Sequence, residues 1–302
     1  MTFPNLVIAG APKCGTSSLF SWLADHPQVC GSSVKEPFFL MDEGNPMLRT
    51  ACNVHDHGLD AYSSFFRGCA GERVVVEATT HYLYQKTALE TLATLPTEPR
   101  ILFLLRKPSE RIYSSFAYSK ERGNVRRDVG FADFLRLAED NPGETAQGWA
   151  TGASAYVLPR DLQYSRYSDY LGEWRRKFGD ERMKILLFED LRADPKAMLQ
   201  DLCGWLGIDP AFYDDYAFAG RNPTISVRSP AIQRVARGVA AKLGSGSLKT
   251  LAKRFYFALQ SKRRTEGRTE TDEAALARLD QQFGPFNERL EREFGLDLSA
   301  WE

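Results

Sequence analysis

The feature that most constrains the fold is a short apolar run that passes through a glycine-containing loop directly into a helical pattern. The run is Leu6–Ala9, the loop is Gly10-Ala11-Pro12-Lys13-Cys14-Gly15-Thr16-Ser17-Ser18, and the helical pattern extends over Ser17–Asp25. At such a junction backbone N–H groups converge and the helix dipole adds positive potential, so an anion can be held there. We therefore expect the fold to begin almost at residue 1 with an anion-binding strand–loop–helix unit.

Buried-strand runs and amphipathic helical patterns then alternate along the chain. Such alternation predicts an α/β fold with a doubly wound parallel sheet and helices on both faces, in a single domain over residues 1–302. The further strand runs are Arg73–Val76, Ile101–Leu105 and Met183–Phe188, and the further helical patterns are Ser109–Arg122, Phe131–Ala138, Ser168–Phe178, Lys196–Leu206 and Asp272–Phe294.

A basic insert at residues 221–268 interrupts this pattern. The whole chain has zero formal net charge, yet the insert holds twelve Lys or Arg against one acid, Glu266. Two helical patterns in it flank the flexible segment Gly244–Ser247. Three interpretations stay open: a mobile lid over the site, a helix pair on an anionic membrane surface, or a solvated helical hairpin. Neither charge nor motif points to a nucleic acid, and the oligomeric state has no signal in the sequence.

The cysteines and the N-terminus bear on the compartment. The five cysteines are odd in number and scattered without a CxxC pair, which argues against a disulfide framework and for a reducing compartment. No basic segment precedes a long apolar run, and no run reaches the length of a membrane span. We therefore expect a cytoplasmic protein.

The loop after the first strand has the glycine spacing of a Walker A motif but not its lysine. Gly10 and Gly15 fit GxxxxGK[ST], whereas Thr16 stands where that motif needs lysine. Lys13 lies in mid-loop instead, a position suited to the bridging oxygen of a donor with one phosphate and one sulfate and no metal. A nucleoside-triphosphate kinase stays open as an alternative, as does an inactive anion-binding module.

Two motifs carry a resemblance to the PAPS-dependent sulfotransferases, which use 3′-phosphoadenosine-5′-phosphosulfate (PAPS). Pro12–Leu19 resembles their 5′-phosphosulfate loop PKxGT[TS]xL, and the run from Leu104 to Phe116 resembles their 3′-phosphate motif LLRxPxERxYSxY. The resemblance implies a P-loop-like sulfotransferase fold, PAPS as co-substrate and no metal. The donor-binding residues that it implies are Lys13, Cys14, Gly15, Thr16, Ser17, Ser18, Arg106 and Ser114, with Gly267 and Arg268 balanced against a solvated charge run. Arg111 is expected to be a helix-surface charge rather than a further ligand.

The acceptor side carries two candidate bases. Val34-Lys35-Glu36-Pro37-Phe38-Phe39 resembles the Glu-x-His-Phe-Phe segment of the carbohydrate and heparan-type members, whose Glu is the base; Phe38 replaces the His. Glu36 is thus the favoured base. His81, in Glu77-Ala78-Thr79-Thr80-His81, is the second candidate, with a hydrogen-bonded strand-end histidine as the alternative. His55 and His57 lack further metal ligands nearby, so a surface loop is expected there.

These inferences together predict an enzyme. It moves a sulfo group in line from PAPS to a hydroxyl of a sugar, lipid or natural product, with Lys13 stabilising charge on the leaving phosphate.

Overall fold

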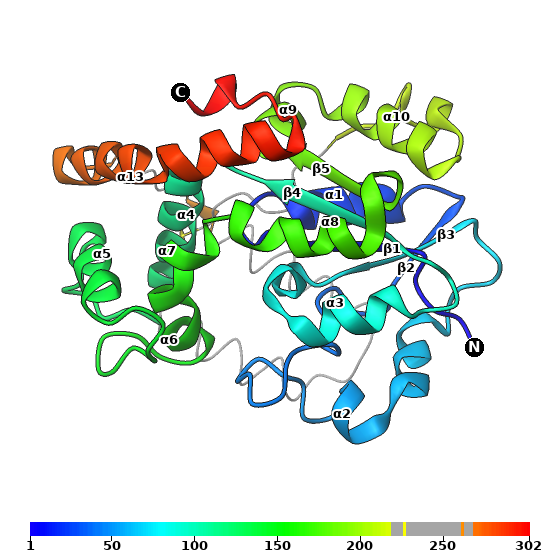
Figure 1. Cartoon of the computed structure of the whole chain (residues 1–302), viewed down its shortest axis with the longest axis horizontal. Helices are drawn as coiled ribbons and strands as arrows, with labels where there is room; N and C mark the ends of the chain where they lie inside the picture. The colour runs from blue at the N-terminus through cyan, green and yellow to red at the C-terminus, as the bar shows by residue number, and fades with distance from the viewer. Residues whose placement is uncertain (219–225, 228–260, 263–267) are drawn as a thin grey trace.

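The computed structural model describes residues 1–218, 226–227, 261–262 and 268–302, and its core is a parallel sheet (Figure 1). The five strands lie in the order β2-β3-β1-β4-β5, and all four pairings are parallel. Their bounds are β1 Leu6–Gly10, β2 Val29–Gly31, β3 Val74–Ala78, β4 Arg100–Leu105 and β5 Met183–Leu187. The predicted α/β fold with a parallel sheet is confirmed.

Helices cover both faces of this sheet. In Figure 1, α3 and α8 lie in front of the strands and α1 lies behind them. Right-handed crossovers require this, because the connection from β1 to β2 runs across the sheet in the opposite direction to those from β3 to β4 and from β4 to β5. The α-helices are α1 Thr16–Ala24, α2 Val54–His57, α3 Lys86–Ala93, α4 Pro108–Glu121, α5 Phe131–Asp140, α6 Ala153–Val157, α7 Asp161–Tyr164, α8 Ser168–Arg182, α9 Phe188–Ala193, α10 Pro195–Leu206 and α13 Glu270–Phe294. The 3₁₀ helices are η1 Leu59–Phe66, η2 Thr80–Tyr84, η3 Leu158–Arg160, η4 Pro210–Tyr213 and η5 Ser299–Trp301.

The position of β1 explains where a ligand can bind. The chain leaves β1 toward β2 on one side, and β4 pairs with β1 on the other, with Val7 beside Ile101 and Ile8 beside Leu102. Ligands of open α/β sheets bind at the carboxyl ends of the strands where the winding reverses in this way. The loops after β1 and β4 therefore meet at one edge of the sheet.

The predicted long elements are present with ends shifted by a few residues, and the short ones were missed. Strand β2 has three residues, too few for a hydrophobic pattern to single it out. Helices α2, α6 and α7 have four or five residues each. Local capping explains two helix starts that the sequence indicated: Pro108 and Pro195 occupy the first turns of α4 and α10.

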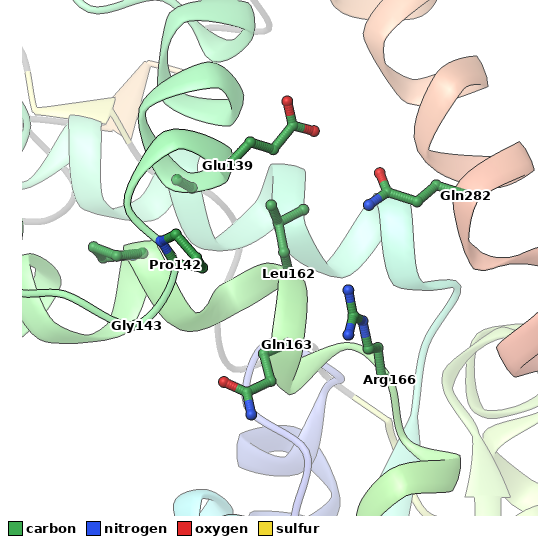
Figure 2. A pocket seen from close by; sticks show the side chains of 9 residues that line it. Glu139, Pro142, Gly143, Leu162, Gln163, Arg166 and Gln282 are labelled. Atoms are coloured by element: carbon green, nitrogen blue, oxygen red, sulfur yellow. The ribbon is translucent and has the colours of Figure 1, made fainter.

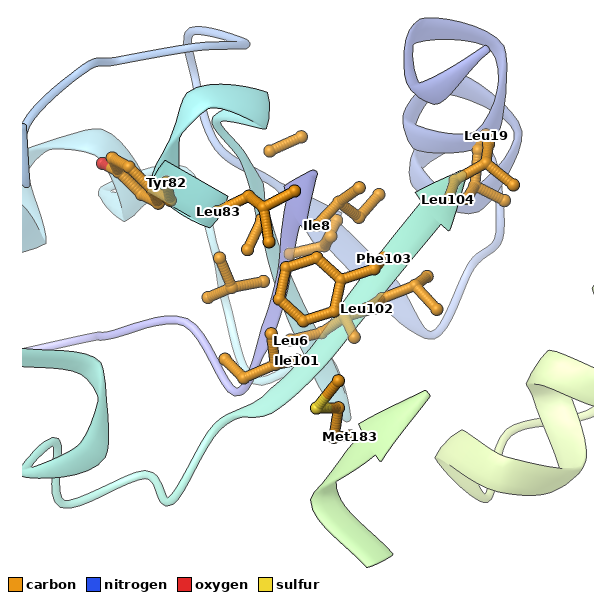
Figure 3. Packing of buried hydrophobic residues seen from close by; sticks show 14 of the residues in the cluster. Leu6, Ile8, Leu19, Tyr82, Leu83, Ile101, Leu102, Phe103, Leu104 and Met183 are labelled. Carbon is orange, nitrogen blue, oxygen red and sulfur yellow. The ribbon is translucent and has the colours of Figure 1, made fainter. Parts of the chain in front are cut away.

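The apolar residues form two clusters. The larger one surrounds the sheet, and Figure 3 shows side chains from β1 and β4 packed with Leu83 of η2. The smaller cluster joins α4, α5 and α13 beyond the sheet edge and includes Ile112, Phe134 and Leu279. Because α4 and α13 pack on each other here, the C-terminal helix is anchored beside the loop that follows β4.

A disulfide contradicts the expectation drawn from the cysteines. Cys30 of β2 is bonded to Cys69, which precedes β3. Their separation of 39 residues hid the pair, because only the pairing of β2 with β3 brings the two cysteines together. The expectation of a reducing compartment rested on the absence of a disulfide, and the disulfide removes that support. The cytoplasmic location stays a prediction.

The basic insert 221–268 falls almost wholly outside the described residues. Of it, Ser226–Val227 (β6) pairs antiparallel with Ser261–Lys262 (β7), and Arg268 is described. Both predicted helical patterns, the segment Gly244–Ser247 and Gly267 lie outside, so the three interpretations of the insert stay predictions. Within the described residues, no helix combines the length and apolar character needed to cross a membrane.

Candidate donor and acceptor site

The loop between β1 and α1 has the geometry of an anion cradle. Gly15 precedes the helix with φ +85°, and a Cβ there would come within 2.7 Å of the Phe188 ring, so only glycine fits. No side chain caps α1, which leaves its first-turn N–H groups directed at the loop. Lys13, Cys14, Gly15, Thr16, Ser17 and Ser18 thus lie together where the sequence placed them.

Lys13 projects from this loop toward α4. Its backbone has φ +70°, and its Nζ lies 3.6 Å from the centroid of the Tyr118 ring. Burial, and after it the charge of Arg122, lower the pKa of Lys13 to about 8. Among the described residues, no carboxylate lies within 4 Å of this ammonium group.

Arg106 and Arg268 converge on one carboxylate at the next strand end. Arg106 follows β4 and donates to Glu110 Oε2 at 3.0 Å, and its guanidinium lies 4.8 Å from the Phe188 centroid. Arg268 donates to the same oxygen at 2.6 Å. Two arginines separated by 162 positions in the sequence thus share one acid. The charge run before the last helix therefore reaches the site through Arg268.

The start of α13 fixes Arg268 in this position. Thr269 and Asp272 form a reciprocal cap, with each side chain accepting from the other's backbone N–H at 3.1 and 3.0 Å. Lys107 Nζ lies 3.0 Å from the carboxylate of Asp280, which also accepts from the Ser109 hydroxyl. These bonds hold α13 against the first turn of α4. Ser114, on the second turn of α4, is half-buried.

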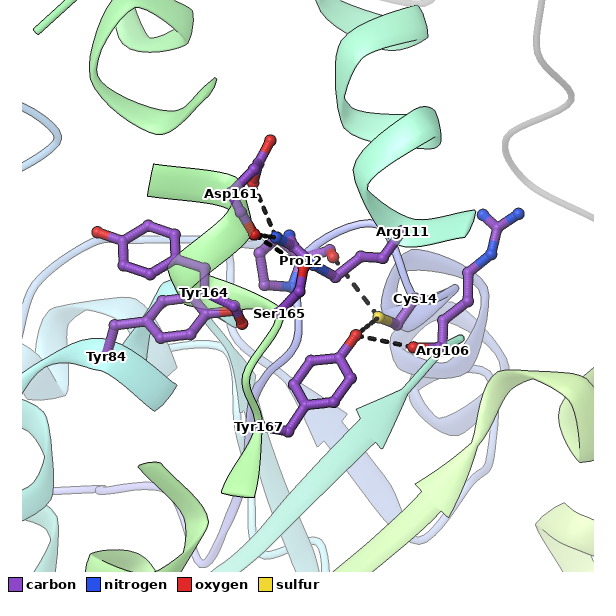
Figure 4. A network of polar contacts seen from close by, with 9 residues as sticks. All are labelled: Pro12, Cys14, Tyr84, Arg106, Arg111, Asp161, Tyr164, Ser165 and Tyr167. Atoms are coloured by element: carbon purple, nitrogen blue, oxygen red, sulfur yellow. Dashed lines mark hydrogen bonds and ion pairs between the residues drawn. The ribbon is translucent and has the colours of Figure 1, made fainter. Parts of the chain in front are cut away.

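A buried network links the loops that follow β1 and β4 (Figure 4). The Tyr167 hydroxyl donates to the Arg106 carbonyl at 2.9 Å and lies 3.8 Å from Cys14 Sγ. Burial raises the pKa of the Cys14 thiol to about 11, so the thiol is neutral. Cys14 thus contributes packing and backbone geometry to the cradle, and Tyr167 ties the β1 loop to the β4 loop.

Arg111 corrects a prediction. It is not a surface charge: its side chain is 0% exposed, and Nη2 lies 2.9 Å from Asp161 Oδ1. Its Nε donates to Ser165 Oγ at 2.9 Å. Although burial acts the other way, Asp161 raises the pKa of Arg111 above its ordinary value. The helical pattern could not reveal this, because the partner lies on α7, some fifty residues later.

Glu36, the base favoured by the sequence, is held by hydrogen bonds of its backbone and its carboxylate. Its backbone has φ +60°, and its N–H donates to the Ala78 carbonyl at 2.8 Å. One carboxylate oxygen accepts from Thr80 Oγ1 at 2.8 Å and from Lys35 Nζ at 3.1 Å. Burial raises the pKa of this carboxyl, but Lys35, His81 and Thr80 outweigh it and hold the pKa below its ordinary value. Glu36 is therefore ionised at neutral pH.

His81 lies beside this carboxylate in a buried aromatic setting. Burial lowers the pKa of His81 to about 4 against the opposite pull of Glu36, so the ring is neutral. Its Nδ1 is buried and has no hydrogen-bond partner among the described residues. Its ring centroid lies 6.3 Å from that of Phe38. His81 of η2 therefore lies near Phe38, the position at which the resembled segment has a histidine. The alternative drawn from the sequence was a strand-end histidine satisfied by hydrogen bonds. The Nδ1 of His81, which has no partner among the described residues, does not fit that alternative.

Glu77, His55 and His57 have structural partners. Glu77 is buried and accepts from the hydroxyls of Tyr62 and Thr79; burial raises its pKa to about 8. His55 bonds the Met41 carbonyl through Nε2 at 2.9 Å, and His57 accepts from the Asn53 N–H at 3.3 Å. The two histidines lie on the short helix α2 and not in a loop. Their exposed rings form hydrogen bonds with nearby backbone groups.

A cavity lies elsewhere, between α5, α7 and α13 (Figure 2). It has a volume of about 330 Å³, and none of the predicted donor or acceptor residues lines it. Leu162 lies at its centre in the view, with Arg166 and Gln282 to one side. The candidate site described above is therefore separate from this cavity.

The fold and the two strand-end loops define an α/β protein with a P-loop-like anion site, and the chain belongs to the sulfotransferase domain family. The model of that family, the Sulfotransferase domain, matches residues 3–217. Carbohydrate sulfotransferase 15 of Rattus norvegicus is 23% identical over 271 residues, which cover 75% of this chain and 48% of that protein. Heparan sulfate glucosamine 3-O-sulfotransferase 3B1 of Homo sapiens is 22% identical over 99% of this chain and 65% of that protein.

A solved structure supports the fold. A sulfotransferase from Alicyclobacillus acidocaldarius superposes with a TM-score of 0.65, at 24% identity, over 100% of this chain and 99% of that one. This chain spans about half the length of the first of the curated relatives above. The sulfotransferase family and its P-loop-like α/β fold, both predicted from the sequence motifs, are confirmed.

Proposed function

We propose that the protein transfers the sulfo group of PAPS to a hydroxyl of a carbohydrate-type acceptor. The observation that carries the proposal is the meeting of two cationic loops at the ends of β1 and β4, with Arg268 added from the start of α13. One loop suits a 5′-phosphosulfate and the other a 3′-phosphate. Membership of the sulfotransferase family supports the reaction type.

The donor site assigns a task to each group in it. The N–H groups at the start of α1 bind the 5′-phosphate, and Arg106 and Arg268 bind the 3′-phosphate together with the Ser114 hydroxyl. Glu110 holds both guanidinium groups in place before the donor arrives, at 3.0 and 2.6 Å. Lys13, in its protonated form, stabilises the charge that develops on the leaving phosphate. Gly267 completes this set as a prediction from the sequence.

Glu36 is the base in this proposal. It is ionised at neutral pH, and the bonds from Thr80 and Lys35 leave its second carboxylate oxygen available to an acceptor hydroxyl. The hydroxyl oxygen attacks sulfur, the bond from sulfur to the bridging oxygen breaks, and Glu36 takes the hydroxyl proton. His81 is buried, and its Nδ1 is shielded from solvent, which suits support of Glu36 through its position better than contact with an acceptor hydroxyl.

The names of the relatives favour a sugar acceptor, because both describe carbohydrate or heparan sulfate chemistry. Lipid and natural-product hydroxyls are the other classes to compare. Transfer of label from radiolabelled PAPS, screened across the three classes, identifies the acceptor. Transfer only to a lipid or natural product would overturn the carbohydrate assignment.

Donor recognition has a separate test. Adenosine 3′,5′-bisphosphate should raise the melting temperature far more than AMP or ATP does, without Mg²⁺. Arg106→Ala should weaken bisphosphate binding by about ten- to a hundredfold, since it removes charge-assisted hydrogen bonds of about 1.5–3 kcal/mol each. Arg126→Ala is the matched control, because Arg126 forms an exposed pair with Asp128 at the surface. Tighter binding of ATP with Mg²⁺ would favour the kinase alternative instead.

A further inference from the structure

Tyr118 is an exposed aromatic residue that the proposed chemistry does not use. It lies on α4, one turn after Ser114, and 42% of its surface is exposed. Within the described part of the chain, the other large hydrophobic residues with exposed side chains are Met1 and Val34. Exposed aromatic area beside a cluster of cations indicates a role in binding.

The ring of Tyr118 lies under the proposed catalytic lysine. Lys13 Nζ is 3.6 Å from the ring centroid, the shortest such cation–ring distance among the described residues. An ammonium group at this distance over an aromatic face is attracted by the ring quadrupole. The contact is made across the gap between the β1 loop and α4, so it fixes where the lysine points.

The charges around Lys13 affect how readily it holds its proton, which is why its contact with the Tyr118 ring is important. Arg122, which follows α4 and lies 4.4 Å from the centroid of the same Tyr118 ring, disfavours its proton, as does Arg106 after β4. Asp161 on α7 and Glu121 on α4 favour it. Burial adds a larger unfavourable effect, so the pKa falls to about 8. Neither acid comes within 4 Å of the ammonium, which leaves the ring face as its contact partner among the described residues.

We propose that Tyr118 is a positioning residue for Lys13: the face of its ring holds the ammonium group between the β1 loop and α4 and favours its charged form. This inference rests on the proposed function. A neutral lysine could not stabilise the leaving phosphate, and a mobile one would lose its alignment with it. The aromatic face supplies attraction without the full negative charge that would repel an anionic donor.

The test compares Tyr118→Leu with Tyr118→Phe in the full-length protein. The leucine variant should lower kcat about 2- to 30-fold and should move the alkaline limb of kcat/KM to lower pH by about half to one and a half units, because cation–ring attraction is lost. The phenylalanine variant keeps the ring and should stay within about twofold of the wild type. Bisphosphate binding, measured by thermal shift, should persist in both.

Trp205→Leu is the matched control. Its ring on α10 also receives two cations, Arg100 at 5.5 Å and Lys184 at 5.9 Å, and neither belongs to the proposed site. This variant should leave the alkaline limb in place. An unchanged limb in Tyr118→Leu would overturn the proposal, and so would an equal loss in Tyr118→Phe, since the hydroxyl would then be the active group. Absence of sulfo transfer by the wild type would refute the proposed function instead, before any variant is compared.

Discussion

Replacement of Arg111 by methionine is expected to destabilise the protein strongly without removing a donor ligand. Arg111 and Asp161 are both fully buried, and their closest approach is 2.9 Å. Removal of one partner leaves the other as an uncompensated charge in a medium of low polarity, which typically costs about 3–5 kcal/mol. The Arg111→Met variant should lose that much unfolding free energy.

The size of the loss in unfolding free energy depends on which buried polar groups lose a partner when Arg111 is replaced. The substitution would leave Ser165 Oγ with its bond to the Asp161 carbonyl at 2.8 Å, so the serine stays satisfied. The carboxylate of Asp161 would lose its only ion-pair partner within the described residues. The double variant Arg111→Met with Asp161→Leu removes both charges and should recover most of the loss, because apolar replacement of a buried pair is often neutral.

Urea unfolding measures these differences. At a slope of about 3 kcal/mol per molar, the midpoint of Arg111→Met should fall by about 1–1.7 M with the slope unchanged. Arg126→Met, which breaks the exposed pair with Asp128, is the control and should leave the midpoint in place. A loss below about 1 kcal/mol in Arg111→Met, or a double variant as unstable as the sum of the single ones, would refute the reasoning.

The further predictions concern the two proposed reacting groups, Glu36 and Lys13. Glu36→Gln should lower kcat by about 10²–10⁴ with bisphosphate affinity nearly unchanged; loss of activity in His81→Ala but not in Glu36→Gln would reassign the base. Thr80→Val removes a bond that lowers the pKa of Glu36, so the acid limb of kcat/KM should move to higher pH, with a rate loss of about tenfold. For Lys13, kcat/KM should decline as pH rises past about 8, because the charged form is lost there. Lys13→Arg should extend activity to higher pH at a lower maximum, and an unshifted limb would contradict the assignment.

The proposed donor half of the site was predictable because its groups lie in short contiguous motifs. The glycine spacing around Lys13 and the position of Arg106 after an apolar run already imply adjacent strand ends. Parallel pairing of β1 with β4 then brings the two loops together without further information. Arg268 needed the structure, because its approach to Glu110 depends on the packing of α13 against α4.

The contacts that could not be predicted from the sequence all join distant segments. Thr80 reaches Glu36 across 44 positions, and Asp161 reaches Arg111 across 50. A charged residue within an amphipathic helix, such as Arg111, is most simply interpreted as solvated. Only its buried partner Asp161 on α7 shows that Arg111 is not. The contact of Lys13 with Tyr118 is of the same kind, since ring and ammonium come from separate elements.

The bond between Cys30 and Cys69 turns the acceptor side of the protein into a covalent ring. Residues 31–68, which include Glu36 and Phe38, form a loop closed across a separation of 39 positions. Closure on this scale removes about 4 kcal/mol of chain entropy from the unfolded state. A single proteolytic cut anywhere in the ring would release no fragment until a thiol reductant opened it.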